Sequence, residues 1–343
     1  MKNVLFATTA LVAFGGAAAV AQEIPASLTV SGGAELGISY TDFDADSGTP
    51  GDDLPNDGFD FVADYGIDFT FNATSNSGIS FGANVEVENN GTSGDDIDDL
   101  NVFVSGAFGT LTLGDIDSAY DAATVGIQTG GLADEADDYF SDSGLDGSAT
   151  GNTILRYDYT VSGFTLSAGI ELSDNDEIFD PIVSGGIDYS GSFSGVGLSV
   201  GLAVQGTSTD SPGVLGDGDH TLISVSARAE FGSIGVNGFF ENWDAPDDAF
   251  FEDFQTYAGS VDYSAGPITV GANVVIRDGD NVDNQSFGAF ADYDLGGGLA
   301  IVAAVGFSNA IIPAGGESYA DSDIFANDGD DSVRAGLGFS MSF

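Results

Sequence analysis

The chain ends on residues 332–343, SVRAGLGFSMSF, and this stretch decides the fold. Apolar side chains occupy every second position as far as the last residue, with small or polar side chains between them. A period of two places the apolar residues on one face of a β-strand. The stretch therefore predicts a strand with one apolar face that runs to the end of the chain.

The same alternation recurs upstream, at 28–40, 59–73, 79–88, 196–205, 223–231, 268–277 and 299–308. A strand that crosses a bilayer at a tilt needs about 9–11 residues, whereas strands of soluble sandwiches usually have about 5–6. The longest segments, 28–40 and 59–73, favour membrane-spanning strands. Their polar faces carry carboxylates, which a water-filled interior tolerates and a dry core does not.

Two kinds of connection alternate between these segments. Tight Gly/Ser turns are expected near 74–78, Gly109, 161–163, 191–195, 232–233, 264–267 and 297–298. Long acidic loops are expected near 41–58, 89–99, 115–151, 173–181, 206–219, 243–254, 278–284 and 309–331. These seven turns and eight loops join sixteen strands. The sequence thus predicts an all-β protein, a transmembrane antiparallel β-barrel of about 16 strands.

Residues 1–21 have the composition of a secretory signal peptide. Lys2 is followed by a short apolar run from Val4 to Val20, and a small-residue site ending at Ala21 precedes Gln22. The run is too short and too rich in Ala and Gly to favour a membrane anchor. No Pro-rich or Ser-rich linker divides the rest, so we expect residues 22–343 to form one domain, with no transmembrane helix.

The charge balance excludes one class of partner. The chain has 55 acidic residues against 5 basic ones, so the phosphates of a nucleic acid would be repelled. Such acidity often accompanies disorder, but 42% hydrophobic and 11% aromatic residues indicate a folded protein. There is no cysteine, so pairing of every strand on both sides in a closed barrel must supply the stability that disulfides give many exported domains.

Three stretches, in this order, resemble the general porins of Gram-negative bacteria. Residues 108–115, FGTLTLGD, are similar to the turn and strand that precede the third loop of that family, and residues 154–158, ILRYD, to the strand that follows it. The third stretch is the final strand, which ends on Phe343. The resemblance extends over 22–343.

This resemblance implies an outer-membrane porin in contact with lipid and lipopolysaccharide. It implies a homotrimer, a third loop folded into the barrel, and passive diffusion of small hydrophilic solutes and ions through a water-filled channel. It also implies that the barrel-assembly machinery reads Phe343 as an assembly signal.

On this resemblance, residues 115–151 form the constriction loop. Its candidate constriction residues are acidic: Asp115, Asp117, Asp121, Asp134, Glu135, Asp137 and Asp138. Rings of Asp and Glu attract cations and repel anions. The alternative is an extracellular loop whose acids are merely solvated. Strand parity also points ten carboxylates into the lumen, namely Glu35, Asp60, Asp64, Asp68, Glu86, Asp158, Glu171, Asp188, Asp262 and Asp292. We therefore expect cation selectivity.

The chain departs from the family in its few arginines. Porins of this kind set a cluster of arginines on the lumen wall against the acids of the third loop. Without Lys2, the basic residues are Arg156, Arg228, Arg277 and Arg334, and parity places all four in the lumen. Either they form the basic pore wall, or they pair with carboxylates such as Asp158 and Glu230. The transverse field is expected to be weaker than in the family, or differently placed.

Calcium is a candidate ligand of the acidic loops. Asp42, Asp44 and Asp46 are spaced like the start of a calcium loop, although the following glycine comes one place late. Dense carboxylates repel one another, and divalent cations relieve that repulsion. The alternative is an acidic surface adapted to salty water. No other cofactor is expected.

The sequence does not favour an enzyme. The single histidine, His220, is expected at an exposed loop–strand edge, and it cannot build a multi-histidine metal site. No G-x-S-x-G elbow marks a catalytic serine. Two rival classes remain. A secreted calcium-loaded β-module should carry G-G-x-G-x-D repeats, which are absent, and a barrel enzyme should carry a catalytic cluster at its rim.

Overall fold

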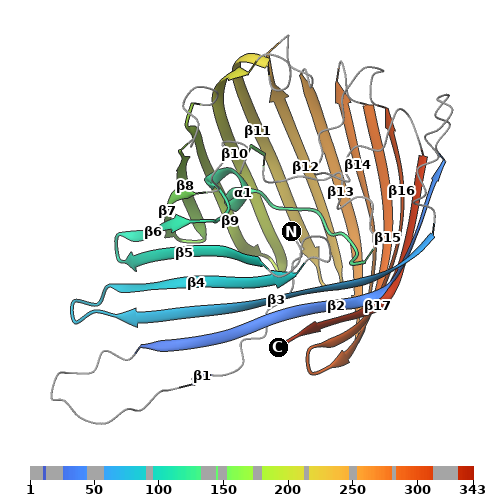
Figure 1. The fold of residues 1–343 in the computed structure, drawn as a ribbon, viewed down its shortest axis with the longest axis horizontal. Helices are drawn as coiled ribbons and strands as arrows, with labels where there is room; N and C mark the ends of the chain where they lie inside the picture. Colours follow the sequence, from blue (N-terminus) through green and yellow to red (C-terminus); the bar gives the residue numbers. More distant parts are fainter. Residues whose placement is uncertain are drawn as a thin grey trace.

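The computed structural model describes residues 11–12, 26–44, 58–89, 96–132, 144–145, 153–172, 180–211, 216–246, 253–279, 283–311 and 331–343. Each strand pairs antiparallel with the next one in sequence, and the ring closes where β17 pairs with β2 (Figure 1). The prediction of a 16-stranded closed barrel is confirmed.

The first half of the barrel consists of β2 (Ser27–Asp44), β3 (Gly58–Thr74), β4 (Ser80–Asn89), β5 (Asp96–Gly106), β6 (Gly109–Gly114), β7 (Ile154–Val161), β8 (Phe164–Glu171) and β9 (Ile182–Phe193). The second half consists of β10 (Val196–Ser211), β11 (Gly216–Phe231), β12 (Ile234–Asp244), β13 (Phe254–Ala265), β14 (Ile268–Gly279), β15 (Asp283–Gly296), β16 (Leu299–Ile311) and β17 (Asp331–Ser342).

A two-residue strand, β1 (Leu11–Val12), pairs with Leu28 and Thr29 of β2. It falls inside the predicted signal peptide, whose other residues lie outside the described ranges. Cleavage after Ala21 therefore stays a prediction.

The seam between β17 and β2 closes the barrel. The two strands pair from Asp331 opposite Asp44 to Ser342 opposite Gly33. Beyond that register, the amide of Phe343 donates to the carbonyl of Gly32 and the amide of Gly32 donates back, each over 3.0 Å. The last residue of the chain is thus hydrogen-bonded into the seam. The apolar alternation of residues 332–343 reflects this membership in the sheet.

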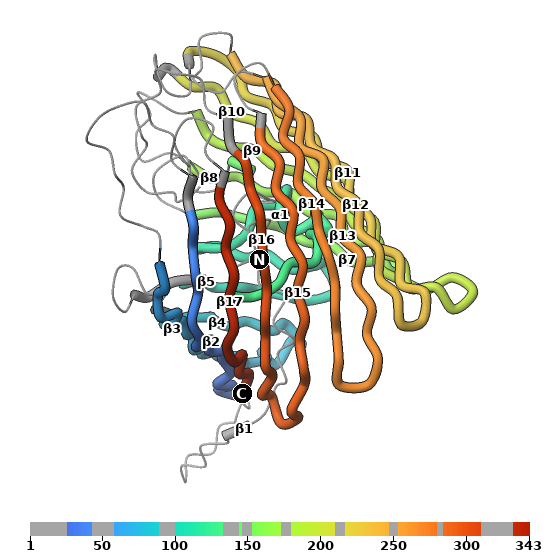
Figure 2. Tube along the Cα trace, turned by 90° about the vertical axis from the view of Figure 1, so that its right-hand side faces the viewer, coloured from blue at the N-terminus to red at the C-terminus, as the bar shows by residue number. Residues whose placement is uncertain are grey.

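The predicted tight turns lie where the sequence placed them, at one end of the barrel (Figure 2). Two of the hairpins turn on Ser162–Gly163 and Ser194–Gly195. In both, the serine and the glycine have positive φ angles, near 53° and 84°. A two-residue loop of this kind matches the right-handed twist of the flanking strands, which explains the Ser-Gly pairs.

One predicted long loop is much shorter than expected. Residues 206–219 were expected to be a loop, but β10 continues to Ser211 and β11 begins at Gly216. The pairing of Asp210 with Asp217 extends the hairpin. Apolar alternation is required only where one face meets lipid. Beyond that zone a strand can be polar on both faces, so the pattern ended before the strand did.

Burial is inverted relative to a soluble protein. Outward-facing Val225, Val261 and Val305 are 47–48% exposed, whereas inward-facing Ser224 and Thr256 are at most 1% exposed. Aromatic residues near the turn ends of strands also face outward, among them Phe164, Tyr263 and Tyr293. An apolar outer face and a polar inner face fit a barrel that stands in a membrane. Among the described residues, no helix is long and apolar enough to cross one.

This inversion makes a testable prediction for adjacent positions on β14. Val270 faces outward, and Thr269 faces the interior in register with Asp292. We expect Val270→Arg to destabilise the barrel by up to about 2–4 kcal/mol, the cost of a basic residue at the lipid midplane. Thr269→Arg should cost less, since its cation enters water beside a carboxylate. Urea unfolding in lipid vesicles measures both, and equal losses would contradict the assigned faces.

Candidate pore constriction

The third loop, between β6 and β7, enters the barrel as a short helix. Helix α1 (Ala119–Ala123) begins after Ser118, whose hydroxyl accepts hydrogen bonds from the amides of Tyr120 and Asp121 at 3.1 and 3.4 Å. The helix packs against β8, β9 and β10 on the inside of the ring (Figure 1). The expectation that this loop folds inward is confirmed for its described part.

Two glycines let the helix lie directly on the wall. A Cβ atom at Gly186 would stand 2.3 Å from the Cβ of Ala123, and one at Gly201 would stand 2.0 Å from the carbonyl oxygen of Ala123. Real side chains do not approach so closely. The absence of side chains at these positions of β9 and β10 therefore lets α1 pack directly on the strand backbone.

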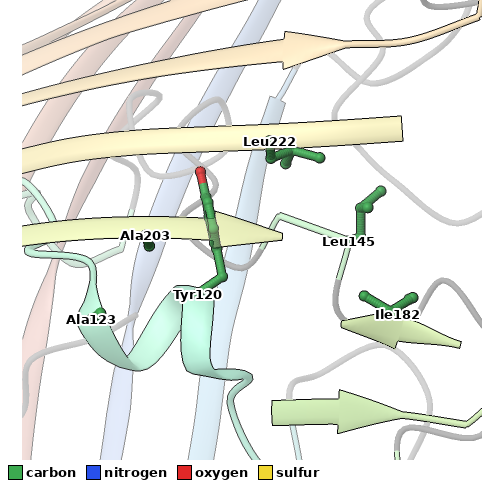
Figure 3. Close-up of a cluster of buried hydrophobic side chains, with 6 residues drawn as sticks. All are labelled: Tyr120, Ala123, Leu145, Ile182, Ala203 and Leu222. Atoms are coloured by element: carbon green, nitrogen blue, oxygen red, sulfur yellow. The ribbon is translucent and has the colours of Figure 1, made fainter. Parts of the chain in front are cut away.

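A small apolar core fixes both limbs of the loop at this place. Tyr120 and Ala123 of α1 and Leu145 of the returning limb pack with three wall residues, Ile182, Ala203 and Leu222 (Figure 3). The tyrosine hydroxyl donates to Oε2 of Glu241 at 2.5 Å, and the amide of Leu145 donates to Oε1 of Gln205 at 2.7 Å. Trp243, the one tryptophan of the chain, packs against this core from inside the barrel.

The chain then crosses the inner wall as an extended segment, residues 124–132, here called the strap. Wall serines accept hydrogen bonds from its backbone: the amide of Val125 donates to Ser226 Oγ, and that of Gln128 to Ser260 Oγ, each at 2.8 Å. On β9, Ser184 does the same for the helix, accepting from the amide of Ala119 at 3.1 Å.

Wall asparagines bind the strap's carbonyl groups. Asn237 Nδ2 donates to the carbonyl of Gly126 at 2.7 Å, and Asn273 Nδ2 donates to that of Gln128 at 3.2 Å. Serines and asparagines from β11 to β14 thus satisfy both donors and acceptors of an irregular segment, which cannot complete a sheet of its own. Figure 1 shows the strap running from α1 past these strands.

Arg228, on β11 beside the strap, is held by two carboxylates. Nη1 of Arg228 lies 2.8 Å from Asp262, and its Nε lies 3.0 Å from Glu230. The same Nη1 donates to Oδ1 of Asn237 at 2.5 Å, which links the ion pair to the strap.

At the start of the loop, Arg156 pairs with Asp158 at 3.0 Å. It also donates from Nη1 to the carbonyl of Asp117 at 2.6 Å. Arg156 thus lies on the inner wall beside the third loop and also pairs with a carboxylate. Its role as part of a basic pore wall stays a prediction. Arg277 lies 5.0 Å from the ring centroid of Phe254, and Arg334 is on the inner face of β17, two positions from buried Ser332.

The acidic loop residues are placed only in part. Asp117 is exposed, Asp115 is half-buried, and Asp121 is buried on α1. The other four candidates, Asp134, Glu135, Asp137 and Asp138, lie outside the described residues. A constriction formed by these acids stays a prediction.

A second group of acids lines the opposite wall. The register sets Glu35 opposite Asp64, and Asp68 opposite Glu86, so β2, β3 and β4 present like charges to one another. All four side chains are half-buried. Carboxylates directly opposite each other on neighbouring strands repel one another. It concentrates negative potential on one side of the lumen.

His220 corrects an expectation from the sequence. It was expected at an exposed edge, but it is 2% exposed. Its Nδ1 accepts from the Trp243 indole at 3.4 Å, and its Nε2 lies 3.3 Å from the Thr209 hydroxyl. The expectation was wrong because β11 already begins at Gly216, so His220 lies within the strand. Its position there turns the imidazole inward, against Trp243.

The calcium candidates do not assemble in the described part of the chain. Asp42 is exposed near the end of β2, Asp44 is its last residue, and Asp46 lies outside the described ranges. Among the described residues, no three His, Cys, Asp or Glu side chains are grouped to hold a metal ion. Calcium at the acidic loops stays a prediction.

Sequence reasoning missed the residues that hold the loop: Ser184, Gln205, Ser226, Asn237, Ser260 and Asn273. Parity correctly assigns them to the inner face. Nothing in their local sequence separates them from Ser199, which bonds only across the wall to Ser190 in the contacts described. Their role depends on a partner loop far away in the sequence.

A closed barrel that is apolar outside, polar inside and crossed by an inward loop has the architecture of a membrane channel. A model of the Gram-negative porin family matches residues 7–310, and the chain belongs to this family. The protein is therefore an outer-membrane porin, a channel protein of the outer membrane.

Individual relatives agree with this assignment. A porin of Rhodobacter capsulatus is 28% identical over 301 residues, which cover 80% of this chain and 92% of that protein. A solved porin structure is similar in fold, with a TM-score of 0.64 at 23% identity, covering 92% of this chain and all of that one. An anion-selective porin from Comamonas acidovorans has a TM-score of 0.66 at 17% identity, covering 93% and 100%.

The strap's hydrogen bonds can be tested by removing two hydroxyl groups, with Ser226→Ala and Ser260→Ala combined. Each hydrogen bond contributes about 0.5–1.5 kcal/mol, so the amides of Val125 and Gln128 should exchange with solvent roughly tenfold faster. Hydrogen exchange measures this directly. Ser199→Ala is the matched control and should leave these amides unchanged. Unchanged exchange in the double variant would refute the anchoring role.

Proposed function

We propose that the barrel is a cation-selective pore for passive diffusion of small hydrophilic solutes and ions. The observation that carries the proposal is the charge on the inner wall. Where an arginine lies at the strap, two carboxylates surround it, since Arg228 pairs with both Asp262 and Glu230. With one arginine and two carboxylates, this place on the inner wall has a net negative charge.

The acidic wall strengthens this argument. Glu35, Asp64, Asp68 and Glu86 stand in like-charge register on neighbouring strands, half-exposed to the interior. Glu35 also lies beside the strap, since its Oε1 would be 3.0 Å from a Cβ at Gly131. The wall's negative potential thus acts where the loop narrows the lumen.

Such charges act over the width of a narrowed lumen. Screening in physiological salt extends over about 8 Å, so an ion that passes a constriction stays within reach of the wall charges. Low-dielectric walls focus the field further and raise the local concentration of counter-ions. Cations should therefore be enriched at the narrow region and anions depleted.

The fold does not by itself determine the sign of selectivity, because an anion-selective porin has a similar barrel. The side chains on the wall must determine it. We further propose a simple diffusion mechanism, in which solutes cross down their gradients and no residue undergoes chemistry. We also propose a homotrimer, as the family resemblance implies. An unboiled sample should then migrate on a gel as an oligomer that boiling dissociates.

The first experiment is single-channel recording from purified protein in a planar bilayer, under a potassium chloride gradient. Stepwise conductance with a cation-selective reversal potential would support the proposal. Steps with an anion-selective potential would refute cation selectivity and move control to Arg156 and the other arginines. Folded protein without conductance would refute the channel.

Neutralising the acidic wall should reduce cation selectivity. We expect Glu35→Gln, Asp64→Asn, Asp68→Asn and Glu86→Gln together to lower the potassium-to-chloride permeability ratio several-fold, because they remove the like-charge wall. The reversal potential measures the ratio. Asp219→Asn is the matched control, since Asp219 is exposed near the loop end of β11 and has outward parity. If the control and the quadruple variant shift the potential equally, the wall is not the selective element.

A further inference from the structure

The strap ends at the seam that closes the barrel. Gly37 and Gly338 are register partners on β2 and β17, so two residues without side chains lie opposite each other on the inner wall. Leu132 lies over this pair. Its Cδ1 atom is 3.0 Å from where a Cβ of Gly37 would stand, and 2.5 Å from that of Gly338. The leucine methyl therefore packs directly on these two glycines, here called the seam pit (Gly37 and Gly338). A side chain at either glycine would meet both this methyl and a backbone carbonyl oxygen of the neighbouring strand, that of Leu337 at 2.6 Å or that of Leu36 at 2.2 Å.

The backbone of Leu132 shows that this seat is specific. Its φ is 69°, in the left-handed region, which non-glycine residues avoid because Cβ crowds the following carbonyl. A branched residue keeps such a conformation only when its surroundings determine it. The seam pit is the described contact of the Leu132 side chain and supplies such a constraint.

The two residues before Leu132 fit the wall in the same way. A Cβ at Gly130 would stand 2.4 Å from the Cβ of Phe290 and 2.9 Å from that of Ala304, so the backbone there touches β15 and β16. Gly131 follows against the Glu35 carboxylate on β2. Residues 130–132 therefore all lie close against the wall, and of these three only Leu132 has a side chain that packs on it.

We propose that Leu132 is the positioning residue of the constriction, and that the seam pit is its socket. At the other end, the apolar core around Tyr120 fixes the loop to β9–β11. With Leu132 seated, the strap is fixed at both ends and cannot swing into or out of the lumen. The socket exists only where β17 has paired with β2, so the constriction takes its final position only in a closed barrel.

This inference rests on the proposed diffusion pore for its electrical readout, but the seat itself is tested without conductance. The chain has no cysteine, so Leu132→Cys combined with Gly338→Cys introduces the only two thiols. A Cβ at Gly338 would stand 2.2 Å from the carbonyl oxygen of Leu36, so the migration shift on boiling must first show that the variant's barrel is closed. Disulfides require Cβ atoms about 3.5–4.5 Å apart. We expect oxidation to link the pair in the folded barrel, as peptide mapping would detect. Leu132→Cys with Ser199→Cys is the control pair, and a link forming no more readily at the seam than there would overturn the seat.

The positioning role is tested with Leu132→Ala. We expect a larger exclusion limit for neutral sugars in liposome swelling and noisier open-channel current, while the migration shift on boiling stays unchanged because the strand ladder is intact. Val125→Ala is the matched control, since it shortens a strap side chain but keeps the backbone bond to Ser226. Leu132→Met should restore the wild-type limit, because it refills the socket.

Three outcomes separate the two proposals. If the disulfide forms but Leu132→Ala has wild-type exclusion and noise, Leu132 is seated but does not position the constriction, and the inference fails. If Leu132→Ala and Val125→Ala change the pore equally, the effect is not specific to the socket, and the inference also fails. If the wild-type barrel neither swells liposomes nor conducts, the diffusion function fails, whereas the disulfide still reports on the seat.

Discussion

The structure depends on one constraint, that no backbone donor or acceptor can be left unpaired in lipid. A sheet meets this constraint only by closing on itself. Here closure falls to the pairing of β17 with β2, which continues through the reciprocal hydrogen bonds of Gly32 and Phe343. The final strand is paired along its length and has one face toward lipid and one toward the interior, so its side chains alternate as far as the pairing extends. The same closure gives each strand one face for lipid and one for water.

Because the inner face of the barrel is polar, a loop can fold inward and still find hydrogen-bond partners. A loop inside a dry core would lose hydrogen bonds, but the inner wall offers hydroxyl and amide groups at the height where the strap crosses it. Ser226, Ser260 and Asn237 bind its amides and carbonyls, and glycines such as Gly201 allow direct backbone contact. The constriction is therefore built from the polarity that the barrel needs anyway, with a small apolar core around Tyr120 to fix its start.

The sequence predicted the parts of the structure that have a local cause. A period of two specifies each strand's faces, and Ser-Gly pairs with positive φ specify hairpins such as Ser194–Gly195. It failed where the cause is distant. The strands next to 206–219 extend because water bathes both faces there, and His220 is buried because Trp243 lies over it. Inward folding of the loop came from family resemblance, and the anchoring residue Ser260 differs from other wall serines only through a strap more than a hundred residues away.

The inner wall separates two tasks that would otherwise conflict. If carboxylates anchored the strap, they would be buried and neutralised by partners, and their charge would not act on a passing ion. If small neutral residues lined the open side, the lumen would carry little potential. The chain instead anchors the strap through uncharged Ser226, Ser260 and Asn273, and sets Asp64, Asp68 and Glu86 in like-charge register on β3 and β4. Carboxylates in this register repel one another, and the paired strands hold them in place. Under the proposed function, this acidic wall is the part of the barrel that attracts cations.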